Sequence, residues 1–291
     1  MAVLVDDPRW PAHGTLWAHL VSDADLAELH AFAASCGVPR RAFDLDHYDV
    51  PAERHEELVA AGAEHVDGHE LVRRLRASGL RVRAVDRPAR AALARRWEAV
   101  LPDNPELGDG LAARWSEPHR VYHAARHLRD VLDRLDLLAA GGEQVTRPVV
   151  LAAWFHDAVH LGSSPADETA SADLATAALE PVVGRVEANE VARLVRLTAS
   201  HDPAADDAGG RALCDADLGV LGGDAESYRV YTDQVRAEYR HVPEPDFRLG
   251  RAAILRRLLG RRALFRTTTG RQLWEAAARR NVAAELRALE A

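Results

Sequence analysis

The hydrophobic pattern of the chain changes its period near residues 81–90, RVRAVDRPAR. Before that segment, short apolar runs alternate with amphipathic stretches. Residues 2–5 and 40–50 predict short extended segments, and three stretches predict helices, at residues 22–37, 52–63 and 67–80. This alternation indicates a small α/β module over residues 1–84.

The first predicted helix carries signals at both of its ends. Ser22 is the expected N-cap, Asp25 lies in the first turn, and Gly37 marks the C-terminal end. Gly79 marks the end of the helix at residues 67–80 in the same way. The sequence therefore predicts where both helices end.

From residue 88 onward, apolar residues recur at three- and four-residue spacing, as is typical of amphipathic helices. Six such stretches cover residues 88–101, 123–140, 147–160, 166–179, 187–201 and 251–265. Ser164, Pro165 and Asp167 are the expected N-cap, N1 and N3 residues of the fourth. The predicted fold class is α+β, with the α/β module followed by an all-α bundle over residues 89–291.

Composition narrows the class of protein. The chain has 291 residues, of which 47% are hydrophobic and 28% are charged, as in ordinary globular proteins, and this length favours two domains. A net charge of -8 argues against a nucleic-acid or anionic-membrane partner. Because there are only two cysteines and no apolar span or leader, we expect a cytoplasmic protein without disulfides.

The fourteen histidines gather in clusters that also contain carboxylates. His123 and His127 are four residues apart, so on a helix they would share one face. His156 and Asp157 are adjacent in an apolar stretch, where burial is costly unless a metal ion or another partner satisfies them. Asp215 and Asp217 are expected to open a further helix.

The order of these residues resembles the H…HD…D signature of the HD superfamily of metal-dependent phosphohydrolases. The pattern YHxxxHxxDV at residues 122–131 is also similar to a helix of the cyclic-nucleotide phosphodiesterases, which belong to the same wider group. The resemblance is closest to bacterial proteins described as predicted HD-superfamily phosphohydrolases. It covers residues 89–291 through the segments EPHRVYH, DETASA, SYRVYTDQVRAEY, LGRAAILRRLL and ARRNVAAEL.

The resemblance implies a role for each matching residue. His123 would be the general acid that protonates the leaving group, and Asp157 would be catalytic as well as a ligand. The metal ligands would be His127, His156, Asp157 and Asp217. One or two divalent ions (Mn, Fe, Zn, Co, Ni or Mg) would activate the water that attacks a phosphate ester.

Other residues remain candidates for a second ion or for the substrate. Arg120 and Arg126 are candidate phosphate ligands because guanidinium groups contact phosphoryl oxygens in pairs. The further candidates are His160, Glu168, His201 and Asp215, although Asp215 could equally cap a helix. Ala124 replaces the asparagine of the phosphodiesterase helix, which argues against a cyclic nucleotide, and His160 is an additional histidine that could alter a second metal site.

The N-terminal module contains its own polar cluster. MAVLVDDPRWPAHGTLWAHLVSDADLAELHAFA, followed by HYDV, resembles a bacterial domain family of unknown function. Its polar residues would form either a second metal or polar pocket or ordinary caps and turns, and they are Asp6, Asp7, His19, His30, His47 and Asp49.

The sequence thus predicts a metal-dependent hydrolase of a nucleotide or another small phosphorylated metabolite. Two alternatives stay open. The helical domain could sense a nucleotide or an ion without turnover and regulate the N-terminal module, or the principal chemistry could reside in that module. A homo-oligomer is compatible with the sequence, and a membrane partner is not expected.

Overall fold

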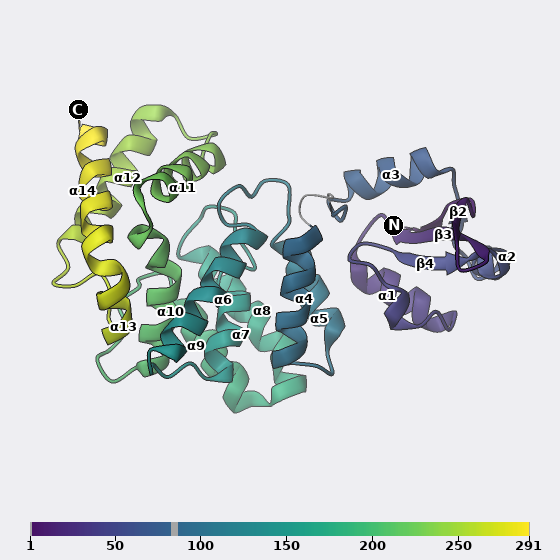
Figure 1. Ribbon diagram of the computed structural model, residues 1–291, viewed down its shortest axis with the longest axis horizontal. Helices are drawn as coiled ribbons and strands as arrows, with labels where there is room; N and C mark the ends of the chain where they lie inside the picture. Colours follow the sequence, from purple (N-terminus) through teal and green to yellow (C-terminus); the bar gives the residue numbers. More distant parts are fainter. Residues whose placement is uncertain (1, 83–86, 291) are drawn as a thin grey trace. The chain divides into compact units, whose positions relative to one another are not determined.

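The computed structural model describes residues 2–82 and 87–290, which form two compact units, residues 1–118 and 119–291. The predicted fold class is confirmed, because a small sheet module precedes a mostly helical region (Figure 1). The boundary predicted at residues 81–90 includes residues 83–86, which lie outside the described residues. None of the described helices combines the length and the apolar character that crossing a membrane requires.

The sheet of the N-terminal unit is built around one long strand, β3 (Thr15–Ser22). It pairs antiparallel with β1 (Val3–Val5), β2 (Trp10–Ala12) and β4 (Tyr48–Pro51). A two-residue strand, β5 (Glu64–His65), pairs parallel with β1. The predicted strand at residues 2–5 is confirmed as β1. The extended piece predicted at residues 40–50 is confirmed only at its end, where β4 begins at Tyr48, because residues 40–42 form a 3₁₀ turn.

The hairpin between β2 and β3 is a part of the sheet that the hydrophobic pattern did not predict. His13 and Gly14 form its two-residue turn with φ of 50° and 81°. Two consecutive positive φ values are typical of the type I′ turn, whose twist matches that of the flanking strands. The signal in the sequence is therefore a histidine-glycine pair in place of the more common asparagine-glycine.

Helices cover both faces of this sheet. On one face, Leu29 and Ala33 of α1 (Leu26–Ser35) pack with Leu20 and Val50. On the other, Leu71 and Leu75 of α3 (Gly68–Ala77) pack with Leu4 and Val21. The unit is completed by 3₁₀ turns η1 (Arg40–Ala42) and η2 (Ala52–Arg54) and by helices α2 (His55–Ala60), α4 (Arg87–Val100) and α5 (Pro105–Arg114).

The predicted Ser22 cap is wrong. Asp25 is the N-cap of α1, and its carboxylate accepts a hydrogen bond from the Glu28 N–H. Ser22 instead ends β3, because it pairs with Val3 of β1. Gly37, with φ of 70°, follows the helix as predicted.

The long helices of the C-terminal unit are α6 (Ala125–Ala140), α7 (Arg147–Phe155), α8 (Ala166–Val183), α9 (Arg185–Leu197), α10 (Ala208–Leu218), α11 (Ala225–Glu238), α12 (Glu244–Leu259) and α14 (Ala276–Glu290). The spacing of apolar residues predicted α6, α7, α8, α9 and the second half of α12, although the predicted stretch at residues 251–265 continues past the end of α12. It did not predict α11 or α14. Short turns η3 (Gly219–Gly222), α13 (Thr268–Gly270) and the π-helical η4 (Arg271–Glu275) connect them. Helices α6, α7 and α10 pack on one another. Two of the predicted ligands, His127 and Asp217, lie on α6 and α10, and the other two, His156 and Asp157, directly follow α7.

Three local predictions in this unit are wrong. The helix α6 begins at Ala125, so His123 lies in the preceding turn and does not share a helix face with His127. Asp215 and Asp217 lie near the end of α10, whose N-cap is Asp207. The N-cap of α8 is Pro165, and Ser164 precedes it, so Asp167 is at the second helical position.

Candidate functional site

Two buried histidines face each other at the centre of the C-terminal unit. His127 lies in the first turn of α6, and His156 follows the last residue of α7. Their Nε2 atoms are 3.2 Å apart. His156 Nδ1 donates a hydrogen bond to the Ala153 carbonyl over 2.8 Å, which directs the lone pair of its other nitrogen toward His127.

Two carboxylates complete this cluster. Asp157 Oδ2 lies 3.3 Å from His156 Nε2 and 3.9 Å from His127 Nε2. Asp217 Oδ1 lies 3.1 Å from His127 Nε2 and 3.7 Å from His156 Nε2. Ligand atoms of His127, His156 and Asp157 all fall within 4.8 Å of one another. The structure thus brings the four predicted ligands together.

The charges of the cluster also fit a cation. Burial lowers the pKa of His127. Burial also opposes protonation of His156, but the carboxylates of Asp157 and Asp217 raise the pKa of His156 to about 9. Two ring nitrogens at 3.2 Å cannot both direct lone pairs at each other, so either a proton or a metal ion must lie between them. Two imidazoles with two carboxylates are a donor set suited to divalent transition metals.

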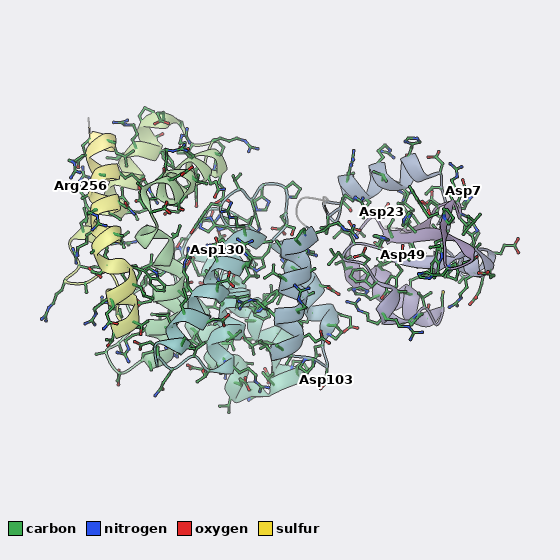
Figure 2. The ribbon with its side chains drawn as sticks, in the orientation of Figure 1. Asp7, Asp23, Asp49, Asp103, Asp130 and Arg256 are labelled. Carbon is green, nitrogen blue, oxygen red and sulfur yellow. The ribbon has the colours of Figure 1, made fainter. Side chains whose placement is uncertain are left out.

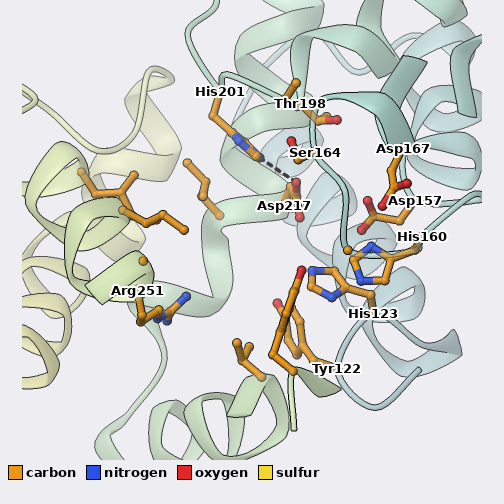
Figure 3. A pocket seen from close by; sticks show the side chains of 18 of the residues that line it. Tyr122, His123, Asp157, His160, Ser164, Asp167, Thr198, His201, Asp217 and Arg251 are labelled. Carbon is orange, nitrogen blue, oxygen red and sulfur yellow. Dashed lines mark hydrogen bonds and ion pairs between the residues drawn. The ribbon is translucent and has the colours of Figure 1, made fainter. Parts of the chain in front are cut away.

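His201 orients one of these carboxylates. Its Nε2 lies 2.7 Å from Asp217 Oδ2 (Figure 3). The other oxygen of the same carboxylate, Oδ1, is left to face His127. The backbone of His201 has φ of 49°, and its carbonyl accepts a hydrogen bond from Arg261 over 2.8 Å. His201 therefore lies beside the ligand set and supports it through Asp217.

His123 is held beside the cluster by Glu238, the last residue of α11. Its Nδ1 lies 2.5 Å from Glu238 Oε1. The other oxygen, Oε2, accepts hydrogen bonds from the backbone N–H groups of Val121, Tyr122 and His123 over 2.7–3.1 Å. Burial opposes protonation of His123, but the hydrogen bond to Glu238 raises the pKa of His123.

His160 and Glu168 approach the same region from the loop that follows α7 and from α8. His160 Nε2 lies 3.2 Å from Glu238 Oε1, and ligand atoms of His123, Asp157 and His160 form a second group within 4.8 Å. Glu168 lines the adjoining cavity, and among the described residues its buried Oε2 has no hydrogen-bond partner. Both residues are therefore positioned for a second ion or for a substrate.

Asp167 and Asp215 have structural roles. Asp167 Oδ2 accepts hydrogen bonds from the Leu161 and Ser163 N–H groups, which shapes the loop before α8. Asp215 is fully buried and accepts hydrogen bonds from the N–H groups of Arg266 and Thr267 and from the Thr267 hydroxyl. Asp215 is thus turned toward the segment 266–267, whereas Asp217 faces the histidines.

The structure does not bring the two predicted phosphate ligands to the cavity. Arg120 is buried, and its guanidinium donates hydrogen bonds to the carbonyls of His123, Asp157 and Ala158. Arg126 is exposed on α6, with Nε 4.0 Å from Asp130 Oδ2. Arg120 therefore braces the backbone on either side of the cluster.

A cavity of about 500 Å³ adjoins the cluster. His123, Asp157 and Asp217 line it (Figure 3). Tyr231 and Phe247 contribute aromatic surface to its wall. Its arginines are Arg251, Arg257 and Arg261. Arg251 is paired with Glu285 over 2.7 Å, whereas Arg257 is exposed on α12. The volume suits a drug-sized or nucleotide-sized molecule.

The predicted N-terminal residues form three separate groups within their own unit. His19, His47 and Asp49 lie close together, with His19 Nδ1 3.0 Å from Asp6 Oδ2. Asp7 Oδ1 lies 2.8 Å from Nε2 of His65, which was not among the predicted residues. His30 is buried elsewhere, 2.9 Å from the Tyr48 hydroxyl. Figure 2 shows the side chains of the unit, with Asp7 and Asp49 labelled.

Sequence reasoning missed Glu238 and the cavity-lining residues Tyr231, Phe247 and Arg257 as members of the site. Glu238 lies 115 positions from His123 in an ordinary amphipathic helix, so local spacing carries no signal for it. The resemblance through SYRVYTDQVRAEY includes Glu238 and is the one sequence feature that could have drawn attention to it.

Comparison with known proteins concerns mainly the N-terminal unit. Residues 3–78 match the model of a family described as "Protein of unknown function (DUF4031)". This match agrees with the predicted N-terminal domain of unknown function. No curated protein and no solved structure matches the chain.

Proposed function

We propose that the C-terminal unit is a metal-dependent phosphohydrolase of the HD type, acting on a nucleotide or another small phosphorylated metabolite. The observation that carries this proposal is the convergence of His127, His156, Asp157 and Asp217 beside a cavity of about 500 Å³. The resemblance to the H…HD…D order supports the same assignment from the sequence.

The four residues would hold a divalent ion such as Mn, Fe, Zn, Co, Ni or Mg. When bound, such an ion polarises a phosphoryl oxygen and activates water for attack on phosphorus. The protein groups around it keep the ligands in place. His156 is oriented by the Ala153 carbonyl, and Asp217 is oriented by His201, so both present a fixed atom to the centre.

His123 is the residue best placed to donate a proton to the leaving oxygen. It lines the cavity and lies beside Asp157, in the second group of potential ligands. Because Nδ1 is committed to Glu238, Nε2 is the ring atom available for proton transfer. The negative charge of Glu238 stabilises the protonated ring that such a donor requires.

The cavity supports a substrate with an apolar or aromatic portion as well as a phosphate. Tyr231, Tyr239 and Phe247 supply surface on which a nucleobase can lie. Arg257 offers an exposed guanidinium on the cavity wall for oxygens that do not react. A phosphorylated metabolite without a base would use the same arginine and leave the aromatic surface free.

The decisive experiment is phosphate release from a panel of nucleotides, phosphomonoesters and phosphodiesters with each divalent ion. Wild type, Asp157→Ala and the matched surface control Asp173→Ala, at an exposed position of α8, would be compared. We expect turnover with at least one metal, retained by Asp173→Ala and reduced by about three orders of magnitude or more in Asp157→Ala.

Two other outcomes would contradict the proposal. Nucleotide binding without phosphate release under every metal would favour a non-catalytic sensor. Turnover that is equal in wild type and Asp157→Ala would place the chemistry elsewhere, and separately expressed units would then show whether it belongs to the N-terminal one.

A further inference from the structure

The strand register of the N-terminal sheet gathers polar side chains on one face. His19 of β3 pairs directly with Asp49 of β4. His47 immediately precedes β4, two residues before Asp49, and its ring centroid lies 5.0 Å from that of His19. Side chains two residues apart on a strand point to the same face, and so do directly opposed residues on paired strands. Tyr48, which lies between His47 and Asp49, and Leu20, its partner on β3, point to the opposite face and into the core.

Two carboxylates orient the two histidines of this face. His19 Nδ1 lies 3.0 Å from Asp6 Oδ2, and His47 Nδ1 lies 2.6 Å from Asp46 Oδ1. An ionised carboxylate only accepts hydrogen bonds, so both Nδ1 atoms carry the proton. In the neutral rings the Nε2 atoms therefore keep their lone pairs. This histidine-carboxylate pairing is the arrangement that supports metal-binding histidines.

We propose that the N-terminal unit binds a divalent transition-metal ion through His19, His47 and Asp49. One ligand atom from each of these residues lies within 4.8 Å of the other two. Asp49 Oδ1 and His47 Nε2 are 3.3 Å apart, so one ion can contact both after a small adjustment. Two imidazoles and one carboxylate favour zinc or ferrous iron over magnesium or calcium, which prefer oxygen ligands alone.

The site is open on one side. The side chains of His19 and Asp49 are 27% and 46% exposed, whereas that of His47 is 9% exposed. Three protein ligands leave coordination positions for water or for an oxygen of a small anionic ligand. The two orienting carboxylates, Asp6 and Asp46, are buried, which keeps the histidines in place while the exposed side stays accessible.

The test counts zinc bound per full-length chain by equilibrium dialysis and elemental analysis. The variants His19→Ala, His47→Ala and Asp49→Ala would be compared with wild type and with His69→Ala, which removes an exposed histidine of α3 from the same unit. The series would be repeated in a His156→Ala background, so that zinc at the C-terminal cluster is counted separately.

We expect each ligand variant to bind one zinc ion fewer than wild type and His69→Ala, in both backgrounds. Asp46→Asn should keep the stoichiometry but raise the zinc Kd by about 10–100-fold, because it weakens the support of His47. His19→Ala and Asp49→Ala decide the matter if the more buried His47→Ala fails to fold.

The proposal is overturned if His19→Ala and Asp49→Ala bind as much zinc as His69→Ala. That result would not bear on the proposed phosphohydrolase, because its ion binds at the separate C-terminal cluster and is expected to be lost only in the His156→Ala background. Conversely, the wild-type protein could release no phosphate while the His19 and Asp49 variants each bind one zinc ion fewer. That result would contradict the phosphohydrolase and support the N-terminal site.

Discussion

His123 and Glu238 form a close pair, with Nδ1 and Oε1 2.5 Å apart although 115 positions separate them in the sequence. The same carboxylate accepts hydrogen bonds from three consecutive backbone N–H groups at residues 121–123. Glu238 therefore positions both the ring of His123 and the turn that carries it.

Replacing Glu238 by glutamine should lower kcat far more than it changes KM. The amide would keep the shape of the side chain but remove the charge that stabilises protonated His123. We expect a fall in kcat of about 10–100-fold in the phosphate-release assay. Glu226→Gln, in the first turn of the same helix, is the control, and an equal kcat in both variants would contradict the positioning role.

His201→Ala should weaken the metal site without abolishing it. His201 contacts the Asp217 oxygen that faces away from the two histidines, so its loss frees the carboxylate to rotate. We expect a Kd for the divalent ion about 10–100-fold higher with unchanged stoichiometry, measured by competition with a chelator. His241→Ala, which lies outside the cluster, should match wild type, and loss of the ion itself would identify His201 as a direct ligand.

Asp215→Asn should destabilise the fold and leave metal binding intact. The buried carboxylate accepts hydrogen bonds from residues 266 and 267, and an amide cannot accept them all. We expect a loss of about 2–3 kcal/mol in the free energy of unfolding, measured with urea. A variant that unfolds like wild type but binds no ion would show that Asp215 belongs to the metal site.

The stability of the N-terminal unit should fall in mildly acidic solution because of His30. Burial, together with the positive charge of Arg40, lowers the pKa of His30 from 6.5 to about 4. The unfolded chain therefore binds a proton at a higher pH than the folded one. The contribution of His30 to the free energy of unfolding is fully present above pH 6.5 and decreases as the pH falls toward 4.

His30→Gln keeps a polar atom near the Tyr48 hydroxyl and removes this titration. Between pH 7 and pH 4.5, we expect wild type to lose about 2 kcal/mol more unfolding free energy than the variant. Urea denaturation at both pH values measures the difference, with the exposed His69→Gln as control. Identical pH dependence in wild type and His30→Gln would contradict the assignment.

Periodicity predicted most of the long helices, missed α11 and α14, and failed at the helix ends. The apolar spacing predicts a helix from residue 123, but α6 begins at Ala125. The helix starts later because the backbone N–H groups of Tyr122 and His123 donate hydrogen bonds to Glu238, a tertiary contact that holds them in a turn. The strand β3 was not predicted because polar His19 interrupts its apolar residues, and because the His13–Gly14 turn is an uncommon version of a hairpin signal.

The sequence by itself determined which chemical groups are present, their order along the chain and the amphipathic faces of the helices, because these follow from residue identity and from spacing within one element. Tertiary structure decided which groups meet. Asp215 and Asp217 are alike in type and both lie near the end of α10, yet two residues rotate a helix by about 200°, so one faces the segment 266–267 and the other faces His127. In the N-terminal sheet, strand pairing likewise places Asp49 opposite His19.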